Sequence, residues 1–367
     1  MNFKIVATLL GLAGSAVFTF FPLWNVSAGE SAASTEYKVL PPIRHGNLTV
    51  FPVVAAASHN TQQFLTLDEG LRSGEVVVTE SGGFQPMIRR PIPPSPGPTA
   101  RVNSLVLINN SKRPLILLAG EIVTGGKQDR VIGKDRIVPA ESDPIDLSVF
   151  CVEPGRWTGA SASFGGSVAG SAFVGTMAAP KVRAKAMGDK DQQQVWNEVR
   201  SAQASAVAQV PGPAKAAVGG TTSYARVMAN DEVKERVDAV AVPVEREYRS
   251  LIQQLRDRNA VGVVVAVNGQ IVWADMFAST DLLEKYWPKL VRSYAAEAFV
   301  SRAKSGETDV KAAQAFVDNL QGRHETTDSE PGLYRHTEID GDGFRAFELT
   351  SLLPKTGFEV HMAKMAE

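Results

Sequence analysis

The chain has 367 residues, of which 44% are hydrophobic and 21% are charged, and its formal net charge at pH 7 is −1. These proportions are typical of a globular protein, and the length allows one large or two ordinary domains. Because the net charge is close to zero, we expect no nucleic acid partner and no electrostatic attraction to membranes. The single cysteine, Cys151, excludes an intramolecular disulfide. The five histidines form no HxxxH or HxH pair, so we expect no metal site and no cofactor.

The N-terminus has the pattern of an export signal. Lys4 precedes an uncharged stretch from Ile5 to Trp24, and Val26, Ser27 and Ala28 then form a small-x-small cleavage pattern. We therefore predict a signal peptide over residues 1–28 and a periplasmic or secreted protein. The alternative is an uncleaved membrane anchor, because about 20 apolar residues can span a bilayer.

The N-terminal half is predicted to be rich in β-strands. Residues 29–44 are small and polar and are predicted to form a flexible leader, and a proline-rich loop covers 89–100. A short helical turn is expected at 68–72. In the part from 45 to 157, runs of β-favouring residues predict strands at 47–56, 75–80, 102–109, 114–119, 130–138 and 145–153. The runs at 102–109 and 114–119 are separated by a turn and are expected to be adjacent strands.

The second half is predicted to contain helices and a hairpin. Residues 158–190 are rich in Gly, Ala and Ser and are expected to form a mobile loop or linker. In the part from 191 to 330, apolar periodicity predicts helices at 192–208, 231–240, 244–256, 282–298 and 309–320. Asn268 and Gly269 predict a type I′ hairpin over 261–277, and Thr280 or Asp281 is expected to cap the next helix, which Pro288 kinks or restarts. Residues 331–367 are predicted to form a strand meander, so the fold class is α+β.

Polar residues cluster between Leu117 and Trp157, where strands are expected to end. Glycines at a turn let backbone N–H groups approach an anion, and nearby cations would assist. Glu121 and Glu153 are candidates for a general acid/base pair if they converge. The alternative is a tight turn with structural ion pairs. The candidate ligand-binding residues are Gly125, Gly126, Lys127, Gln128, Arg130, Arg156 and Trp157.

Two further residues lie in apolar strands. Cys151 lies in SVFCVE and is interpreted as a buried, unreactive thiol rather than a nucleophile. Asp275 interrupts the apolar run IVWADMF, and a buried acid needs a partner. Arg292 on the following helix is the predicted partner.

Four segments together resemble a known family. LTLDEGLRSGEVVVTE, LLAGEIVTGGKQDRVIGKDRIVPAES, SVFCVEPGRW and GVVVAVNGQIVWADMFAS are similar to the bacterial ARPP-1 domain, an ADP-ribosylglycohydrolase and rhodanese-phosphatase associated domain. The resemblance covers residues 45–330 and implies no defined reaction. We predict an exported domain that binds a small anionic ligand or a protein partner. The alternative is a hydrolase of a phosphorylated or ADP-ribose-like small molecule, using Glu121, Glu153, Lys127 and Arg130, so enzymatic activity stays open.

Overall fold

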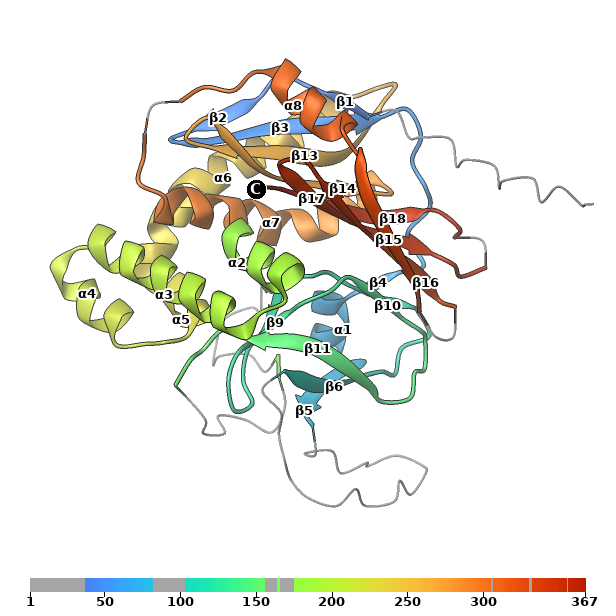
Figure 1. Cartoon of the computed structure of the whole chain (residues 1–367), viewed down its shortest axis with the longest axis horizontal. Helices are drawn as coiled ribbons and strands as arrows, with labels where there is room; N and C mark the ends of the chain where they lie inside the picture. The colour runs from blue at the N-terminus through green and yellow to red at the C-terminus, as the bar shows by residue number, and fades with distance from the viewer. Residues whose placement is uncertain are drawn as a thin grey trace, which may run out of the picture. The chain divides into compact units, whose positions relative to one another are not determined.

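The computed structural model describes residues 37–81, 103–155, 164–165, 175–304, 306–329, 332–354 and 356–367. In these ranges the chain has the predicted α+β fold, with a β-rich N-terminal half, helices around a hairpin, and strands at the C-terminus (Figure 1). Residues 36–367 belong to one compact unit.

Strands occur throughout the described chain, and most helices lie between residues 180 and 318. The strands are β1 (Tyr37–Val39), β2 (Ile43–His45), β3 (Leu48–Ala55), β4 (Leu65–Thr66), β5 (Val76–Glu80), β6 (Ser104–Asn109), β7 (Leu115–Leu117), β8 (Glu121–Val123), β9 (Arg130–Ile132), β10 (Arg136–Val138), β11 (Ile145–Cys151), β12 (Thr176–Met177), β13 (Asn259–Val267), β14 (Gln270–Phe277), β15 (Gly322–Asp328), β16 (Tyr334–Gly341), β17 (Phe344–Ser351) and β18 (Glu359–Ala366). The helices are α1 (Leu67–Ser73), α2 (Pro180–Ala184), the π-helical turn η1 (Lys185–Asp189), α3 (Gln192–Gln209), α4 (Gly212–Gly219), α5 (Tyr224–Ala229), α6 (Asp231–Gln254), α7 (Thr280–Val300) and α8 (Val310–Asp318).

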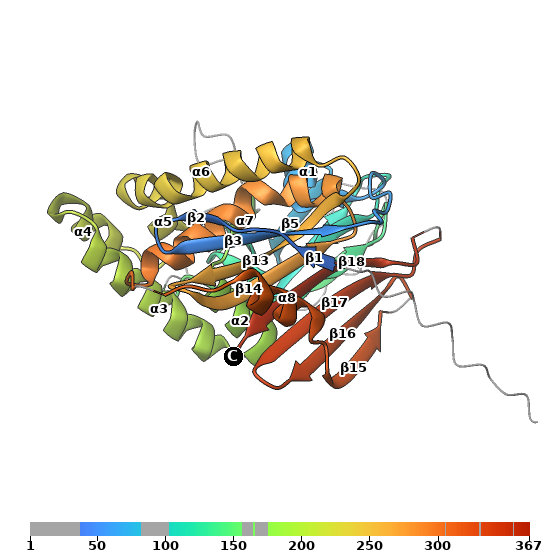
Figure 2. The ribbon, with the colours of Figure 1, turned by 90° about the horizontal axis from the view of Figure 1, so that it is seen from above.

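The largest sheet among the described residues is antiparallel and has the order β1-β3-β13-β14-β18-β17-β16-β15, with β2 also paired to β3. Its C-terminal strands form the predicted meander, and β18 joins them to the hairpin strand β14. Side chains alternate between the two faces of a strand. Val263 and Val265 therefore pack with residues of α6 and α7, whereas Val264 packs with Ala313 of α8 on the other face (Figure 2).

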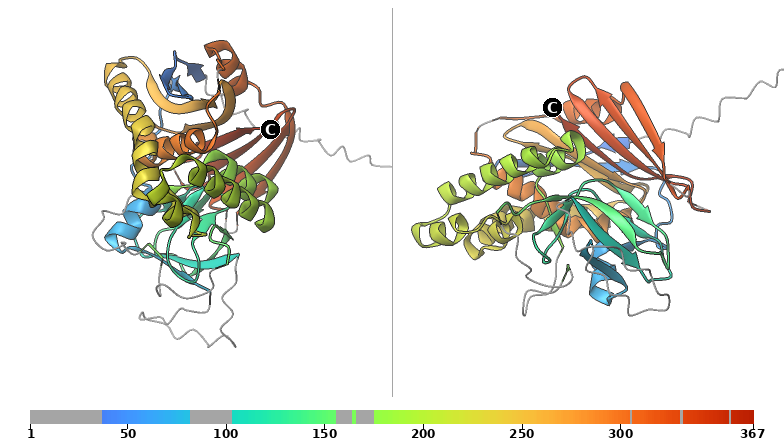
Figure 3. Two further views of the ribbon diagram at one scale, coloured as in Figure 1. Left: turned by 90° about the vertical axis from the view of Figure 1, so that its left-hand side faces the viewer. Right: turned by 60° about the horizontal axis from the view of Figure 1, so that its bottom comes forward.

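Two smaller sheets make up the rest of the β-rich half. Their orders are β12-β8-β9-β11-β6-β5 and β10-β7-β4, and α7 lies between them and the large sheet (Figure 1, Figure 3). The predicted pairing of 102–109 with 114–119 is wrong, because β6 and β7 belong to different sheets. The Asn109 side chain donates to the carbonyl oxygens of Arg113 and Pro139, at 2.8 and 2.9 Å. These hydrogen bonds fix the connection between β6 and β7 as a corner, at which the chain passes from the six-stranded sheet to the three-stranded sheet.

Part of the predicted flexible leader is ordered. Within residues 29–44, the strands β1 and β2 both pair with β3. Val39 is only 3% exposed, and its N–H donates to Gln314 Oε1 at 2.8 Å. This burial of apolar side chains and the strand pairing offset the entropy that ordering costs.

The part of the predicted linker that the structure describes from residue 175 onward is also ordered. It forms β12, α2 and η1, and its small side chains pack closely against the core. Ala178, Val182 and Met187 are each at most 1% exposed. The content of Gly, Ala and Ser had predicted a mobile segment. Small side chains instead let neighbouring elements approach closely, so little side-chain volume is needed to fill the space between them.

The two proline-containing helices are continuous. Residues 231–240 and 244–256 were predicted as separate helices, but α6 runs through Pro243 because one apolar stripe stays buried along its length. Helix α7 likewise runs through Pro288. Its N-cap is Ser279, not Thr280 or Asp281, and the Ser279 hydroxyl accepts a hydrogen bond from the Leu282 N–H at 3.0 Å.

The hairpin prediction is confirmed, and it gives a direct test of the turn. Asn268 and Gly269 have φ of 55° and 75°, and a Cβ on Gly269 would lie 2.2 Å from the Gly306 carbonyl carbon. Gly74 has a φ of 74° with open space around it. We expect Gly74→Ala to cost about 1–2 kcal/mol of unfolding free energy through backbone strain, and Gly269→Ala to cost at least about 1 kcal/mol more through the collision. Equal urea midpoints for the two variants would contradict this packing.

Candidate functional site

The glycine-containing turn between β8 and β9 is held by three carboxylates of the chain itself. The Gly125 N–H donates to Asp129 Oδ1 at 3.0 Å, and the Lys127 N–H donates to Glu80 Oε1 at 2.7 Å. The Asp129 N–H donates to Glu153 Oε2 at 3.1 Å. Backbone N–H groups of this turn were predicted to hold an anion. Those of Gly125 and Lys127 donate instead to carboxylates of the chain itself.

The close approach that glycine allows is also used internally. Gly126 has a φ of 52°, and a Cβ there would lie 2.3 Å from the Phe164 ring and 2.7 Å from Glu80 Oε1. A side chain at this position would displace both groups. Glycine is therefore needed here for packing of Phe164 and Glu80 against the turn.

The end of β11 meets this turn. The Gln128 side-chain amide donates to the backbone oxygen of Glu153 at 3.0 Å, and Arg130 pairs in register with Cys151. Gln128, Arg130 and Glu153 are 4%, 0% and 2% exposed. The structure thus brings Gly125, Gly126, Lys127, Gln128, Arg130 and Glu153 close together, with Gly125 and Lys127 half-buried and the other four buried. Cys151 is fully buried and burial raises the pKa of its thiol, which agrees with an unreactive side chain.

Glu121 belongs to a separate polar group. Its Oε2 accepts the Leu118 N–H at 2.7 Å, and its Oε1 forms a buried ion pair with Lys289 of α7. Lys289 also contacts Asp68 Oδ2 at 2.9 Å. Burial raises the pKa of Glu121 even though the lysine charge opposes the change. Neither hydrogen-bond partner of Glu121 is Glu153, so no direct contact joins the predicted acid/base pair.

Asp275 is at the centre of a second buried network that the sequence did not predict. Arg183 of α2 donates to both of its oxygens, at 2.9 and 3.0 Å, and Tyr294 donates to it as well. The His361 ring lies between two carboxylates, 2.6 Å from Asp135 Oδ2 and 3.2 Å from Asp275 Oδ1. All these carboxylates and bases are fully buried.

The predicted pair of Asp275 with Arg292 is therefore wrong. Arg292 lies on the opposite side of α7 and contacts Asp238 and Glu245 of α6, at 3.0 and 3.1 Å. Spacing along α7 could not identify Arg183, because it belongs to a segment that was predicted to be a loop or linker.

Electrostatics in the Asp275 network favour the charged forms. Burial alone would raise the pKa of Asp275, but Arg183 and His361 lower it far below its usual value. Burial would lower the pKa of His361, yet Asp135 and Asp275 together raise it to about 9. The histidine is consequently an imidazolium at neutral pH and links the large sheet to the β9–β10 turn.

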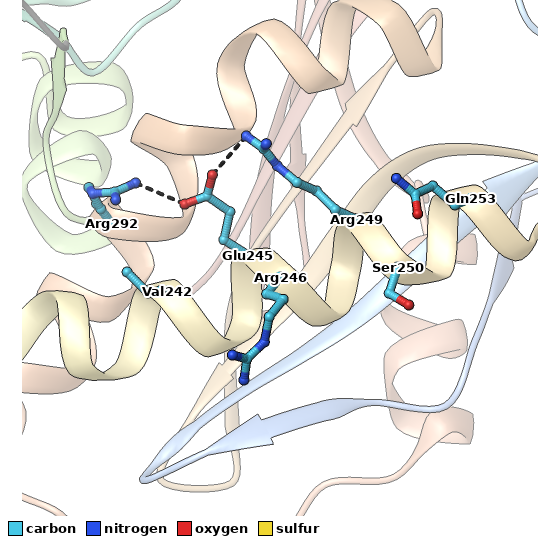
Figure 4. Close-up of a pocket in the computed structure, with 7 residues that line it drawn as sticks. All are labelled: Val242, Glu245, Arg246, Arg249, Ser250, Gln253 and Arg292. Carbon is cyan, nitrogen blue, oxygen red and sulfur yellow. Dashed lines mark hydrogen bonds and ion pairs between the residues drawn. The ribbon is translucent and has the colours of Figure 1, made fainter.

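A shallow groove of about 550 Å³ runs along the outer face of α6. In Figure 4, Glu245 points toward Arg292 and Arg249, and both ion pairs are drawn, whereas Arg246 points away from them. The three arginines therefore do not converge on one point. The groove contains none of the residues that the sequence predicted to bind a ligand or to act as an acid/base pair; its lining is Val242, Glu245, Arg246, Arg249, Ser250, Gln253 and Arg292.

A family profile matches residues 36–365 of the chain. The chain belongs to the ARPP-1 family. The family is described as the ARG and Rhodanese-Phosphatase-superfamily-associated Protein domain. Its extent is larger than the predicted 45–330, because β1 and the C-terminal strands are part of the ARPP-1 region and of the same sheet. No curated protein and no solved structure matched the chain.

Some predicted residues of this ARPP-1 chain cannot be placed. Arg156, Trp157 and the export signal over residues 1–28 lie outside the described residues. Among the residues that are described, none of the helices combines the length and apolar character that a membrane crossing requires. The buried partners Glu80, Lys289 and Arg183 were missed because each is distant in sequence from the group it contacts.

Proposed function

We propose that the protein is a binding domain that works outside the cytoplasm, with its ligand contacts around the Gly125–Arg130 turn and the end of β11. One observation carries this proposal. The polar groups of the turn are fixed by internal hydrogen bonds, yet the Gln128 side-chain oxygen is buried there without a partner. Buried oxygens without partners are rare and costly, and a bound ligand is one way to satisfy them.

Recognition is favoured over catalysis by how the carboxylates are used. A general acid or base must come within hydrogen-bond distance of its substrate. Glu121 and Glu153 each accept a backbone N–H, and Glu121 also pairs with Lys289. Groups held in this way support a rigid frame, which lowers the cost of binding a ligand.

The export part of this proposal rests on the uncharged segment Ile5–Trp24 and the small residues before position 29. Mass spectrometry of the protein recovered from its native host tests it. We expect the mature chain to begin at Gly29, whereas an intact N-terminus would favour the anchor.

A ligand screen by thermal denaturation tests the binding proposal. The mature chain is heated with phosphate, ADP-ribose, amino acids, polyamines and simple sugars. We expect at least one class to raise the midpoint, since a ligand of the folded state stabilises it by mass action. Gln128→Met should abolish that increase, while Gln62→Met, at an exposed site, should keep it. An increase that both variants keep would place the ligand elsewhere, and no increase with any class would remove the support for binding.

A hydrolase of a phosphorylated or ADP-ribose-like molecule is the second candidate. The observation that favours it is the raised pKa of Glu121, since catalytic acids often have carboxyl groups whose pKa is raised by burial. Lys289 beside it would supply a cation for an anionic substrate.

A further inference from the structure

The two edges of the large sheet differ in how they are protected. At one edge, the Gln314 side chain of α8 covers the backbone of β1. Its oxygen accepts the Val39 N–H at 2.8 Å, and its nitrogen donates to the Tyr37 carbonyl oxygen at 3.0 Å. One side-chain amide therefore takes the place of a neighbouring strand. Such covers are common at sheet edges, because unpaired backbone groups are a template for another strand.

Strand β15 forms the opposite edge of this sheet and has no such cover. It pairs with β16 on one side in unbroken register, and no described strand pairs with it on the other side (Figure 2). All seven of its residues are exposed. The strand contains no proline and no lysine, and its pairing has no bulge, so three devices that usually keep an edge from pairing are missing. Its outward backbone groups are therefore open to another strand.

Ion pairs with β16 align β15 without burying it. Arg323 pairs with Asp340 at 2.8 Å, and Asp328 pairs with Arg335 at 2.7 Å. Exposed ion pairs contribute little to stability, whereas ordering a strand costs conformational entropy. A second strand on the open edge would add the hydrogen bonds and the burial that β15 lacks.

The sequence of β15, GRHETTD, fits a second copy of itself. A twofold axis perpendicular to the sheet makes two copies antiparallel and places residues of the same face opposite each other. With the axis at Thr326, His324 lies opposite Asp328 of the second copy, and Glu325 lies opposite its Thr327. Threonines opposite each other and opposite charges both stabilise antiparallel pairs.

The neighbouring registers fit less well. An axis at Glu325 places two glutamates opposite each other, and an axis at His324 places two histidines opposite each other. Like charges directly opposite are destabilising. The Thr326 hydroxyl already lies 3.2 Å from the Thr337 hydroxyl of β16, so the Thr326 register continues a row of threonines across the axis.

We propose that the protein forms a twofold dimer in which the β15 strands of two copies pair antiparallel, centred on Thr326. The charges of β15, which would keep a different strand away, match those of its own copy. This inference goes beyond the binding function and does not depend on the ligand site. One strand from each copy is a small interface, and small interfaces give weak complexes, so the dimer forms as the concentration rises.

Sedimentation equilibrium of the mature chain, from micromolar to millimolar concentration, tests the dimer. We expect the average mass to rise toward twice that of the chain. Thr326→Lys places two ammonium groups opposite each other at the axis, so it should weaken the dimer roughly tenfold or more, as opposed like charges do. Thr222→Lys makes the same change at an exposed site before α5, and it should leave the dimer unchanged.

Thr326→Cys tests the register with a gain of signal, so it does not depend on a destabilised variant. Cys151 is 0% exposed, and the introduced thiol lies opposite its own copy at a separation close to the one that a disulfide spans. We expect oxidation to produce a disulfide-linked dimer on a non-reducing gel. Thr222→Cys is the control and should stay largely monomeric.

Three results would overturn the proposal. The first is a wild-type chain that stays monomeric at millimolar concentration. The second is a dimer that Thr326→Lys leaves intact or that Thr222→Lys weakens equally, because another surface would then hold the copies together. The third is cross-linking of Thr326→Cys no greater than that of Thr222→Cys.

Discussion

Asp275→Asn is expected to lower the free energy of unfolding by about 3–5 kcal/mol, the usual cost of removing one partner of a buried ion pair. Asp275 and Arg183 are both 0% exposed, and their two hydrogen bonds are 2.9 and 3.0 Å long. Asparagine leaves the guanidinium charge in the interior without its counter-charge. Urea unfolding followed by tryptophan fluorescence measures the loss.

Two comparisons identify the cause of that loss. The double variant with Arg183→Met and Asp275→Leu removes both charges, and it should recover much of the stability because apolar residues can replace a buried pair. Arg335→Met breaks the exposed pair of Arg335 with Asp328, and it should change the urea midpoint little because solvent screens that pair. A single Asp275→Asn variant as stable as the wild type would show that the charges are not paired in the interior.

The stability of the protein is expected to fall as the pH rises from about 6.5 to about 9, because of His361. The pKa of His361 is about 9 in the folded chain, above its ordinary value of 6.5. A group with a raised pKa contributes stability that is complete below its unfolded pKa and is lost as the pH rises through the folded pKa. The difference corresponds to a contribution on the order of 3 kcal/mol.

His361→Gln isolates this contribution, because it removes the titrating ring. The pKa values of two other groups limit the pH range in which His361 alone titrates. Burial raises the pKa of Glu359 to about 7 and lowers that of Lys364 to about 8. Urea unfolding between pH 7 and 8 should therefore show a decline in the wild type that is absent from His361→Gln. Parallel profiles would mean that His361 is not held between Asp135 and Asp275.

Local turn chemistry made parts of the fold predictable from sequence. The Asn268–Gly269 turn was correctly placed because two consecutive positive φ angles favour these residue types. The stabilisation that tertiary packing gives to an element could not be predicted from local sequence in the same way. Pro243 removes one hydrogen bond from α6, but the buried stripe on both sides of it keeps the helix continuous. Small residues after position 175 form core elements for the same reason: contact with other segments decides their structure.

The sequence predicted where the candidate site lies, but it did not predict which groups contact one another there. The sequence indicated that Gly125–Arg130 and Glu153 would meet, and they do. It could not identify what each group contacts, because Glu80 lies 47 residues before Lys127, and Lys289 lies 168 residues after Glu121. Periodicity reports which side of an element is buried, and it carries no information on which distant charge lies opposite. Glu121 and Glu153, the predicted acid/base pair, therefore have different hydrogen-bond partners: Leu118 and Lys289 for Glu121, and Asp129 for Glu153.

Turnover of phosphate monoesters and ADP-ribose by wild type and Glu121→Gln tests the central claim, that the motif carboxylates form a frame for recognition. With the Glu121–Lys289 pair buried, we expect no turnover by either protein. Glu121→Gln should instead lower the urea midpoint, because it leaves Lys289 with one carboxylate fewer. Turnover by the wild type that Glu121→Gln abolishes while the variant stays folded would contradict the account and establish the hydrolase.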